Sequence, residues 1–287
     1  MNVANEWKDY KIIDMADGQK LEKWGNITLS RPDPQIIWTS KSYPEKWKKA
    51  DAIYSRSKTG GGAWKYNKKL PDNWQIKYKN LTFNIKPMGF KHTGLFPEQA
   101  VNWDWMINKI KSSKREIKVL NLFAYTGGAT VACLSAGASV CHVDSSKGMV
   151  SWAKENVASS KLNEKKVRYI IDDVNKFVAR EIRRGNKYDA IIMDPPSYGR
   201  GANGEVWQFE NNIYDLVELC TKVLSDKPLF FLINSYTTGI SSTVLANILN
   251  LTVNKEHKGK IEAGEIGLPM ENSQLILPCG IYGRWED

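Results

Sequence analysis

The chain has 287 residues, of which 42% are hydrophobic and 25% are charged, and its formal net charge is +10. This length and apolar content are enough for a substantial core, so we expect a folded rather than a disordered chain. No stretch approaches the roughly 18 to 20 apolar residues that span a bilayer, and the first residues lack the pattern of a signal peptide. We therefore expect a cytoplasmic protein that makes no membrane contact.

The cysteines argue against a zinc site. They lie far apart, without a CxxC pair and without clustered histidines to complete a ligand set. We expect no metal and reduced, mostly buried thiols at all of these positions: Cys133, Cys141, Cys220 and Cys279.

Positive charge is concentrated between Lys41 and Lys91. This segment holds 12 Lys and one Arg against three acidic residues, together with seven tyrosines and tryptophans. Lysines suit contact with phosphates and aromatic rings suit stacking on bases, so we expect the segment to bind nucleic acid. The alternative is a basic domain whose tryptophans belong to the core and whose lysines are hydrated surface.

Residues 1–78 are predicted to form a small, basic, β-rich domain. Extended pieces at Asn26–Leu29 and Gln35–Thr39 are separated by clusters of Pro, Gly and Lys. Ser57–Gly62 ends in three successive glycines, which predicts a mobile loop.

Residues 79–287 are predicted to form the second domain, in which residues 79–111 are a lead-in with a strand at Leu81–Ile85 and a helix at Glu98–Lys111. From Ile117 onward, strand, turn and helix alternate regularly, which predicts an α/β fold with a parallel sheet covered on both faces. Strands are expected at Ile117–Phe123, Ser139–Val143, Val167–Ile171, Ala190–Met193 and Leu229–Ile233.

The third helix of this alternation has clear start and stop signals. Asp173 can cap it and Gly185 can end it. Its apolar residues fall on one face: Val174, Phe177, Val178 and Ile182.

Acidic residues follow the second and third of these strands. Asp144 stands at the end of the second strand, 17 residues after Gly127, where an acid can accept both hydroxyls of a ribose. Asp172 and Asp173 close the third strand, and one of them could accept an adenine amino group; the alternative is that Asp173 is only a helix cap. The turn after the first strand lacks GxGxxG, so a nucleoside ligand without a pyrophosphate fits better than NAD.

The fourth strand leads directly into Asp194-Pro195-Pro196-Ser197-Tyr198. Both prolines lack an N–H, and the second restrains the residue before it to extended geometry, so this turn can present acceptor groups outward. Asp194 and the Pro195 carbonyl could hold a substrate N–H in line with a sulfonium methyl group. Tyr198 could stack on the target base.

Three segments together resemble a known family. They are Asn121-Leu122-Phe123-Ala124-Tyr125-Thr126-Gly127-Gly128, the Asp194–Tyr198 turn, and His92-Thr93-Gly94-Leu95-Phe96-Pro97-Glu98-Gln99, which is similar to a T-G-x-F-x-x-Q motif. The family is the class I S-adenosylmethionine-dependent methyltransferases, among which are the bacterial large-subunit ribosomal RNA cytosine-C5 and guanine-N7 enzymes. The resemblance implies a Rossmann-like, doubly wound, seven-stranded sheet preceded by the small β-rich domain, and an RNA partner, ribosomal RNA in particular.

The resemblance also implies roles for individual residues. Tyr125, Thr126 and Gly127 would line the methionine end of the donor, Asp144 would hold its ribose, and Thr93–Gln99 would close over it. The complete implied donor set is Thr93, Phe96, Gln99, Asn121, Phe123, Tyr125, Thr126, Gly127, Asp144, Ser145, Asp172 and Asp173. The implied catalytic set is Asp194, Pro195, Pro196 and Tyr198.

Two departures from the family limit the transfer. The cytosine-C5 enzymes use a cysteine nucleophile, whereas the corresponding strand end here, Leu232–Thr237, has no cysteine. A packing role is expected for Cys279, so a nitrogen acceptor is favoured over a carbon acceptor. The N-terminal RNA-binding module of those enzymes is not recognisable in this chain.

Other interpretations stay open. The acceptor could be a protein or a small molecule, or the chain could be a non-catalytic RNA-binding protein with this fold, for which Asn121 is slight support because many relatives carry an acid there. His92 lies beside Thr93 but is expected to be structural rather than a general base. The sequence leaves the oligomeric state, the target nucleotide and the methylated atom undecided.

Overall fold

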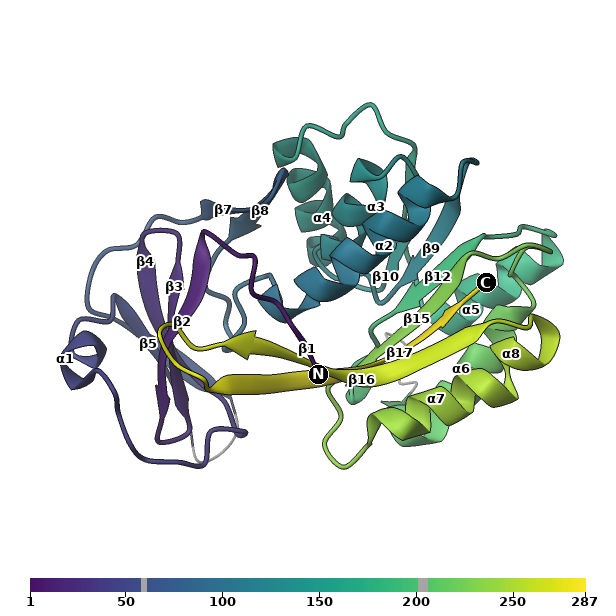
Figure 1. Ribbon diagram of the computed structural model, residues 1–287. Helices are drawn as coiled ribbons and strands as arrows, with labels where there is room; N and C mark the ends of the chain where they lie inside the picture. Colours follow the sequence, from purple (N-terminus) through teal and green to yellow (C-terminus); the bar gives the residue numbers. More distant parts are fainter. Residues whose placement is uncertain (58–60, 201–205) are drawn as a thin grey trace. The chain divides into compact units, whose positions relative to one another are not determined.

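The computed structural model describes residues 1–57, 61–200 and 206–287 (Figure 1). The chain folds into two compact units. The large-sheet unit holds Met1, Asn102–Glu265 and Gly280–Asp287, and the small-sheet unit holds Asn2–Val101 and Ile266–Cys279. The domain boundary expected at residue 78 stays a prediction. The loop expected at Ser57–Gly62 falls largely on residues 58–60, outside the described residues.

The main sheet has the strand order β1-β16-β17-β15-β12-β9-β10-β11. Adjacent pairs from β11 to β15 are parallel, and β17 runs antiparallel to β15. β1 pairs with Ile266 and Gly267 of β16 and adds a short eighth strand at the edge. The strand bounds are β1 Asn2–Val3, β9 Lys118–Leu122, β10 Ser139–Asp144, β11 Val167–Ile171, β12 Ala190–Met193, β15 Phe230–Ser235, β16 Lys260–Pro269 and β17 Ile276–Glu286. The Rossmann-like, doubly wound sheet and its five predicted strands are confirmed.

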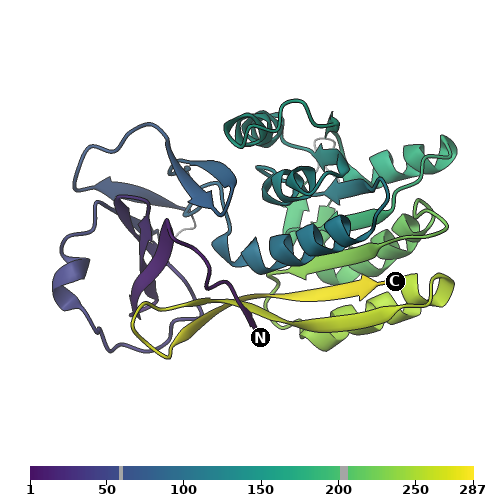
Figure 2. The same ribbon diagram turned by 45° about the horizontal axis from the view of Figure 1, so that its top comes forward.

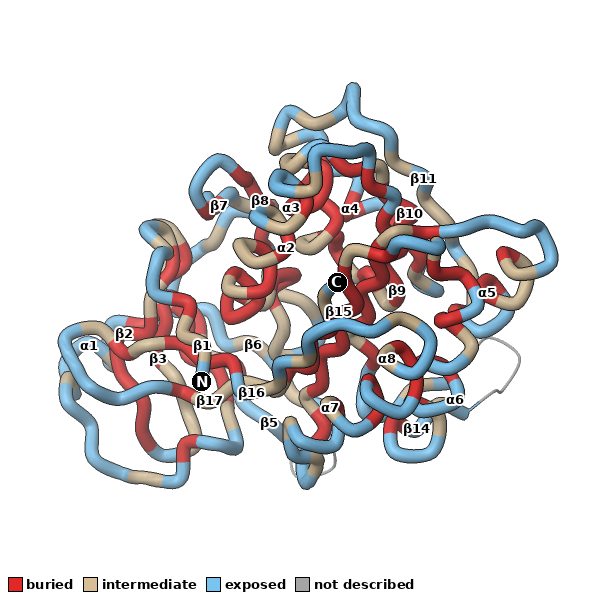
Figure 3. Tube along the Cα trace, turned by 45° about the vertical axis from the view of Figure 1, so that its right-hand side comes forward, coloured by how far each residue is buried: buried red, intermediate tan, exposed pale blue. Residues whose placement is uncertain are grey.

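Helices cover both faces of this sheet, as Figures 1 and 2 show. One layer consists of α2 (Ala100–Ser112), α3 (Gly128–Ser135) and α4 (Lys147–Ser159). The other consists of α5 (Val174–Arg183), α6 (Phe209–Thr221) and α7 (Ser242–Leu251), followed by the short α8 (Val253–Glu256). Burial concentrates in the central strands between the layers (Figure 3), because strands covered on both faces are apolar on both.

Helix α5 forms as its sequence predicts. The Asp173 carboxylate accepts a hydrogen bond from the Lys176 amide at 3.0 Å, and Gly185 after the helix has a φ of +67°. Val174, Phe177 and Val178 are buried, and Ile182 packs against the same core. The interpretation of Asp173 as a helix cap is confirmed.

The small-sheet unit is rich in β-structure. Its five-stranded sheet has the order β2-β3-β4-β5-β6, and β7 and β8 form a separate hairpin. The bounds are β2 Tyr10–Ala16, β3 Gln19–Trp24, β4 Ile27–Pro32, β5 Ala52–Arg56, β6 Gly62–Tyr66, β7 Trp74–Tyr78 and β8 Leu81–Ile85, with α1 at Pro44–Trp47 and a 3-10 turn, η1, at Pro97–Gln99. β4 and β8 confirm two predicted extended pieces. Gln35–Thr39 is not a strand; the carbonyls of Ile36 and Trp38 accept hydrogen bonds from the amides of Gly18 and Asp17 in the β2–β3 turn, and the Trp38 indole donates to the Met15 carbonyl.

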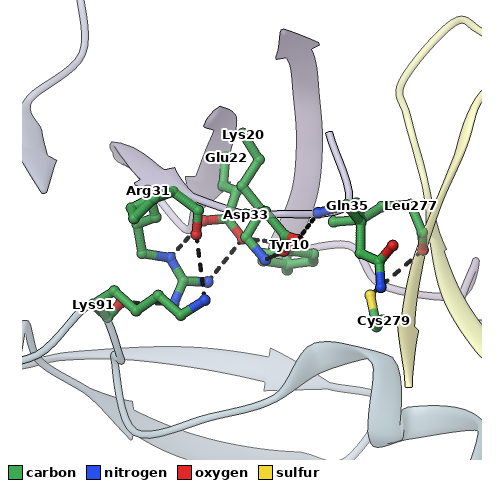
Figure 4. Close-up of polar contacts among 10 residues, drawn as sticks. Tyr10, Lys20, Glu22, Arg31, Asp33, Gln35, Lys91, Leu277 and Cys279 are labelled. Carbon is green, nitrogen blue, oxygen red and sulfur yellow. Dashed lines mark hydrogen bonds and ion pairs between the residues drawn. The ribbon is translucent and has the colours of Figure 1, made fainter. Parts of the chain in front are cut away.

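A buried ion pair lies in the small-sheet unit (Figure 4). The Arg31 guanidinium donates to both oxygens of Glu22, at 2.6 and 2.9 Å, and Tyr10 donates its hydroxyl to the same carboxylate at 2.6 Å. Arg31 also donates to the Lys91 carbonyl at 2.9 Å. Burial alone would raise the pKa of Glu22, but the charges of Arg31 and Lys20 and the two hydrogen-bond donors outweigh it and lower this pKa to about 2.

Candidate functional site

The parallel strands bring four polar segments to one edge of the main sheet. Strand register pairs Leu122 with Val143, and also with Met193, while Asp144 pairs with Ile171. The turns that follow β9, β10, β11 and β12 therefore leave the sheet at the same level. Open α/β sheets bind their ligands at this carboxyl edge.

The turn after β9 has an unusual backbone. Phe123, Tyr125 and Gly127 have φ values of +53°, +51° and +81°. Non-glycine residues rarely adopt such values, and where they do the strain commonly lies at a ligand site. Main-chain hydrogen bonds hold the turn, from the Ala124 amide to Val143 and from the Gly127 amide to Ala124. The bend fits a cradle in which backbone, rather than side chain, faces a ligand.

Asp144 ties the turn after β9 to the turn after β10. Its carboxylate accepts hydrogen bonds from the amides of Tyr125 and Ser146, both at 2.8 Å. Burial raises the pKa of Asp144, and these two hydrogen bonds oppose the rise. A carboxylate has about four lone-pair sites, so two further donors, such as a pair of ribose hydroxyls, can still be accepted. Ser145 beside it is exposed.

A buried polar network that the sequence did not reveal lies behind this turn. Asn121 donates to the Thr130 hydroxyl at 2.9 Å, and that hydroxyl lies 2.9 Å from Nδ1 of His142. Burial lowers the pKa of His142 to about 4, so the ring is neutral at neutral pH. Asn156 donates to the Thr126 carbonyl at 2.8 Å. Asn121 and Thr126 are thus almost fully buried, and their contact with a donor stays a prediction.

The two acids after β11 have different surroundings. Asp173 is engaged as the cap of α5, whereas Asp172 forms an ion pair with Arg180 and accepts from the Asp173 amide. Asp172 is only partly buried. Contact of Asp172 or Asp173 with an adenine amino group stays a prediction.

The turn after β12 is held to its neighbours through Ser197. The Ser197 carbonyl accepts from the Phe209 amide at 3.0 Å, and its hydroxyl accepts from the Thr237 hydroxyl at 2.9 Å. Asp194 is half-buried and Pro195 is buried, while Pro196 and Tyr198 are exposed. Thr237 follows β15, so two adjacent strand ends are joined here, a link with no local signal in the sequence.

The Thr93–Gln99 segment belongs to the small-sheet unit. Thr93 is completely buried, and its hydroxyl has no hydrogen-bond partner within the described part of the chain. Trp7 donates to the Pro97 carbonyl at 2.9 Å, and the Phe96 ring lies 5.4 Å from that of His92. Closure of Thr93, Phe96 and Gln99 over a donor stays a prediction.

His92 is a poor general base in these surroundings. Burial and the nearby charges of Arg31, Lys91 and Lys20 lower the pKa of His92 to about 4. A base with so low a pKa takes up a proton weakly near neutrality. A structural role fits better.

Comparison with known proteins decides the family. The profile of the S-adenosylmethionine-dependent methyltransferase family matches residues 54–244. The chain belongs to this family. It is also similar to a solved SAM-dependent methyltransferase from Agrobacterium tumefaciens, with a TM-score of 0.93 and 34% identity, covering 99% of this chain and 92% of that one.

Curated relatives match over a shorter region. Ribosomal RNA large subunit methyltransferase I from Enterobacter sp. (strain 638) is 41% identical over 85 residues, which is 29% of this chain and 22% of the relative. The protein of the same name from Escherichia coli O139:H28 is 43% identical over 82 residues, 28% of this chain and 21% of the relative. The match thus spans about a fifth of these relatives.

The residues at the sheet edge fit the cofactor of the family. Carboxylates at the second and third strand ends would repel a phosphate but can accept hydroxyl and amino hydrogens of an adenosyl group. Within the described residues, no cluster of three His, Cys, Asp or Glu side chains could hold a metal ion, and no helix is long and apolar enough to cross a membrane.

Gly127→Val should weaken binding of S-adenosylmethionine by at least about tenfold. A Cβ at this position would lie 2.9 Å from Cβ of Ala153, and φ is +81°, so the turn must move. Calorimetric titration with the donor measures the effect. Gly137→Val is the control, since its φ of +97° carries similar strain but an added Cβ meets nothing within 4 Å. Equal donor affinity in both variants would contradict a cradle at Gly127.

Proposed function

We propose that the protein transfers a methyl group from S-adenosylmethionine to a nitrogen atom of a base in ribosomal RNA. The observation that carries this proposal is the Asp194-Pro195-Pro196 turn, which leaves the sheet beside the strained turn after β9. When bound, the cofactor supplies an electrophilic methyl group on a sulfonium. The protein's task is then to bring a base nitrogen into line with it.

The residues of the turn suit an amino group as the acceptor. The Asp194 carboxylate and the Pro195 carbonyl would each accept a hydrogen bond from a base N–H, which fixes the direction of the nitrogen lone pair. The side chain of Tyr198, with 51% of the residue exposed, would stack on the base. Asp194 or water would take the proton that the methylated nitrogen loses.

The surroundings of the cysteines favour nitrogen over carbon. Methylation of cytosine C5 requires a thiolate nucleophile. Burial raises the pKa of Cys141 to about 11 and also raises those of Cys133 and Cys220. Burial, aided by the Glu98 charge, raises the pKa of Cys279 well above its ordinary value. Each of these thiols therefore stays protonated at neutral pH.

RNA as the substrate class is supported by the names of the curated relatives and by the charge of the small-sheet unit. Lys49, Lys65 and Lys69 are exposed and form no ion pair within the described residues. Tyr66, beside Lys65, is 53% exposed, and its ring is stacked with that of Trp64 at 6.4 Å. Basic side chains around exposed aromatic rings suit RNA. A cytoplasmic location, expected from the sequence, goes with a ribosomal substrate.

The proposal is tested by transfer of labelled methyl groups from S-adenosylmethionine into total RNA, total protein and the small-molecule fraction of cells that lack the gene. Label in RNA, located by mass spectrometry on a base nitrogen, is the expected result. Label found only in protein or in small molecules would show that the acceptor is not RNA. RNA binding without any transfer would favour a non-catalytic RNA-binding protein.

The triple variant Lys49→Glu, Lys65→Glu, Lys69→Glu should raise the KM for RNA by about 10- to 100-fold at low salt and leave donor affinity unchanged. Each lost phosphate contact also reduces the salt dependence of binding, by about 0.7 in the log–log slope for a single-stranded nucleic acid. Steady-state rates at several salt concentrations measure both effects. The triple variant Lys165→Glu, Lys222→Glu, Lys258→Glu makes the same change of charge at exposed positions of the large-sheet unit. Equal KM values for the two triples would show that only net charge matters.

A further inference from the structure

Trp207 contacts both the donor side and the acceptor side of the site. It lies on β14 (Val206–Gln208), which pairs antiparallel with β13 (Tyr198–Arg200). Its indole N–H donates to the Pro196 carbonyl at 2.6 Å. Its ring centroid lies 5.2 Å from that of Phe123, with an angle of 52° between the planes. Phe123 and Trp207 both pack against the core beneath the sheet edge.

The acceptor turn needs such an external donor. Pro195 and Pro196 have no N–H, so the turn cannot be fixed by donor groups of its own at these positions. Trp207 instead holds the carbonyl of Pro196, and Pro196 lies two positions after Asp194. Ser197 anchors the next residue from a different direction, through Phe209 and Thr237.

The donor turn also benefits from the same side chain. Phe123 has a φ of +53°, a conformation that costs energy for a residue with a Cβ. Packing against a large ring such as that of Trp207 is one of the contacts that can keep it there. The Trp207 side chain therefore contacts both the turn that would hold the methyl donor and the turn that would hold the acceptor.

We propose that Trp207 is a positioning residue that fixes the distance and angle between the turn after β9 and the Asp194-Pro195-Pro196 turn. The indole N–H sets the acceptor turn, and the indole ring sets the donor turn. This inference rests on the proposed methyl transfer. Its physical basis is that a displacement of about 1 Å between reacting groups can cost about a hundredfold in rate.

Two substitutions separate the two contacts. Trp207→Phe keeps a ring against Phe123 but removes the N–H, so we expect kcat to fall about tenfold while the KM for RNA and the donor affinity stay within about twofold. Trp207→Leu removes both contacts, so we expect a fall of about a hundredfold in kcat and donor binding weakened by about fivefold or more. The assays are steady-state kinetics with RNA from cells that lack the gene and calorimetry with S-adenosylmethionine.

Trp38→Phe is the matched control. Trp38 is also half-buried, and it donates its indole N–H to a main-chain carbonyl, that of Met15, at the same 2.6 Å in the small-sheet unit. A similar loss of thermal stability is expected in Trp38→Phe and Trp207→Phe, with kcat reduced only in the latter. An unchanged kcat in Trp207→Phe, or a change confined to the KM, would overturn the inference.

The experiments distinguish failure of the proposed function from failure of the proposed role of Trp207. A wild-type protein that binds the donor but methylates no RNA would defeat the proposed acceptor. The role of Trp207 would then be decided by donor binding alone: weakened binding in Trp207→Leu but not in Trp207→Phe supports it, and equal binding in both overturns it.

Discussion

Asp194→Asn should reduce methyl transfer by about a hundred- to a thousandfold at saturating donor and RNA, with donor affinity unchanged. The substitution keeps the size of the side chain but removes its negative charge and replaces one acceptor oxygen with an N–H donor. The remaining amide oxygen is a weaker acceptor than a carboxylate, and the new N–H repels a base amino group, so the nitrogen lone pair is aimed less well at the methyl group. Initial rates with labelled donor measure the effect, and calorimetry measures donor affinity.

Asp226→Asn serves as the matched control because Asp226 is exposed and lies outside the site. It should transfer methyl groups at the wild-type rate. If Asp194→Asn keeps more than a tenth of the activity, Asp194 does not orient the acceptor. If both its activity and its donor binding are lost, the substitution has disturbed the sheet edge as a whole.

Arg31→Met should destabilise the small-sheet unit by about 3 kcal/mol, because the buried Glu22 carboxylate loses its bidentate partner and keeps only the more distant Lys20 ammonium, at 3.9 Å, as a counter-charge. Tyr10 alone would remain as a direct side-chain donor to that carboxylate. Urea unfolding followed by far-UV circular dichroism measures the change. The double variant Glu22→Leu, Arg31→Met removes both charges and should recover most of the loss. Equal stability of the single and the double variant would contradict this account.

The same ion pair predicts a dependence on pH. The pKa of Glu22 is about 2 in the folded protein, below its ordinary value of 4.5, so the ionised carboxylate stabilises the fold at neutral pH. This stability is fully present above about pH 4.5 and is lost as the pH falls toward 2. The double variant, which has no carboxylate at this position, should lack this part of the acid dependence.

Local signals explain what the sequence could predict. β9, β10, β11 and β12 are short apolar runs flanked by turn residues, and Asp173 precedes an apolar helical face, so each could be located from its own neighbours. The location of the candidate site could be predicted from one rule, that the carboxyl ends of parallel strands lie at the same edge of a sheet. Gln35–Thr39 failed because its main chain bonds to a turn and not to a neighbouring strand; Ile36 is buried, whereas Ile37 is 86% exposed.

Contacts between distant parts of the chain could not be predicted in this way. Trp207 meets Pro196 and Phe123 only because a hairpin folds back over two strand ends. The network from Asn121 through Thr130 to His142 crosses two strands and a helix, and the sole hint of it was a histidine inside an apolar strand. The left-handed backbone at Phe123 and Tyr125 likewise has no signal in residue type.

Because the chain is synthesised from its N-terminus, the small-sheet unit can be completed only late in translation. This unit combines residues 2–101 with residues 266–279, and Ile12 forms a β-bridge with Met270 while Lys11 pairs with Glu271. The N-terminal strands must therefore wait for nearly the whole polypeptide to be synthesised before these contacts can form. During that interval the backbone of β2 near Ile12 stays unpaired on this side and open to chaperones, and a nascent chain stalled before residue 266 would keep it so until translation resumes.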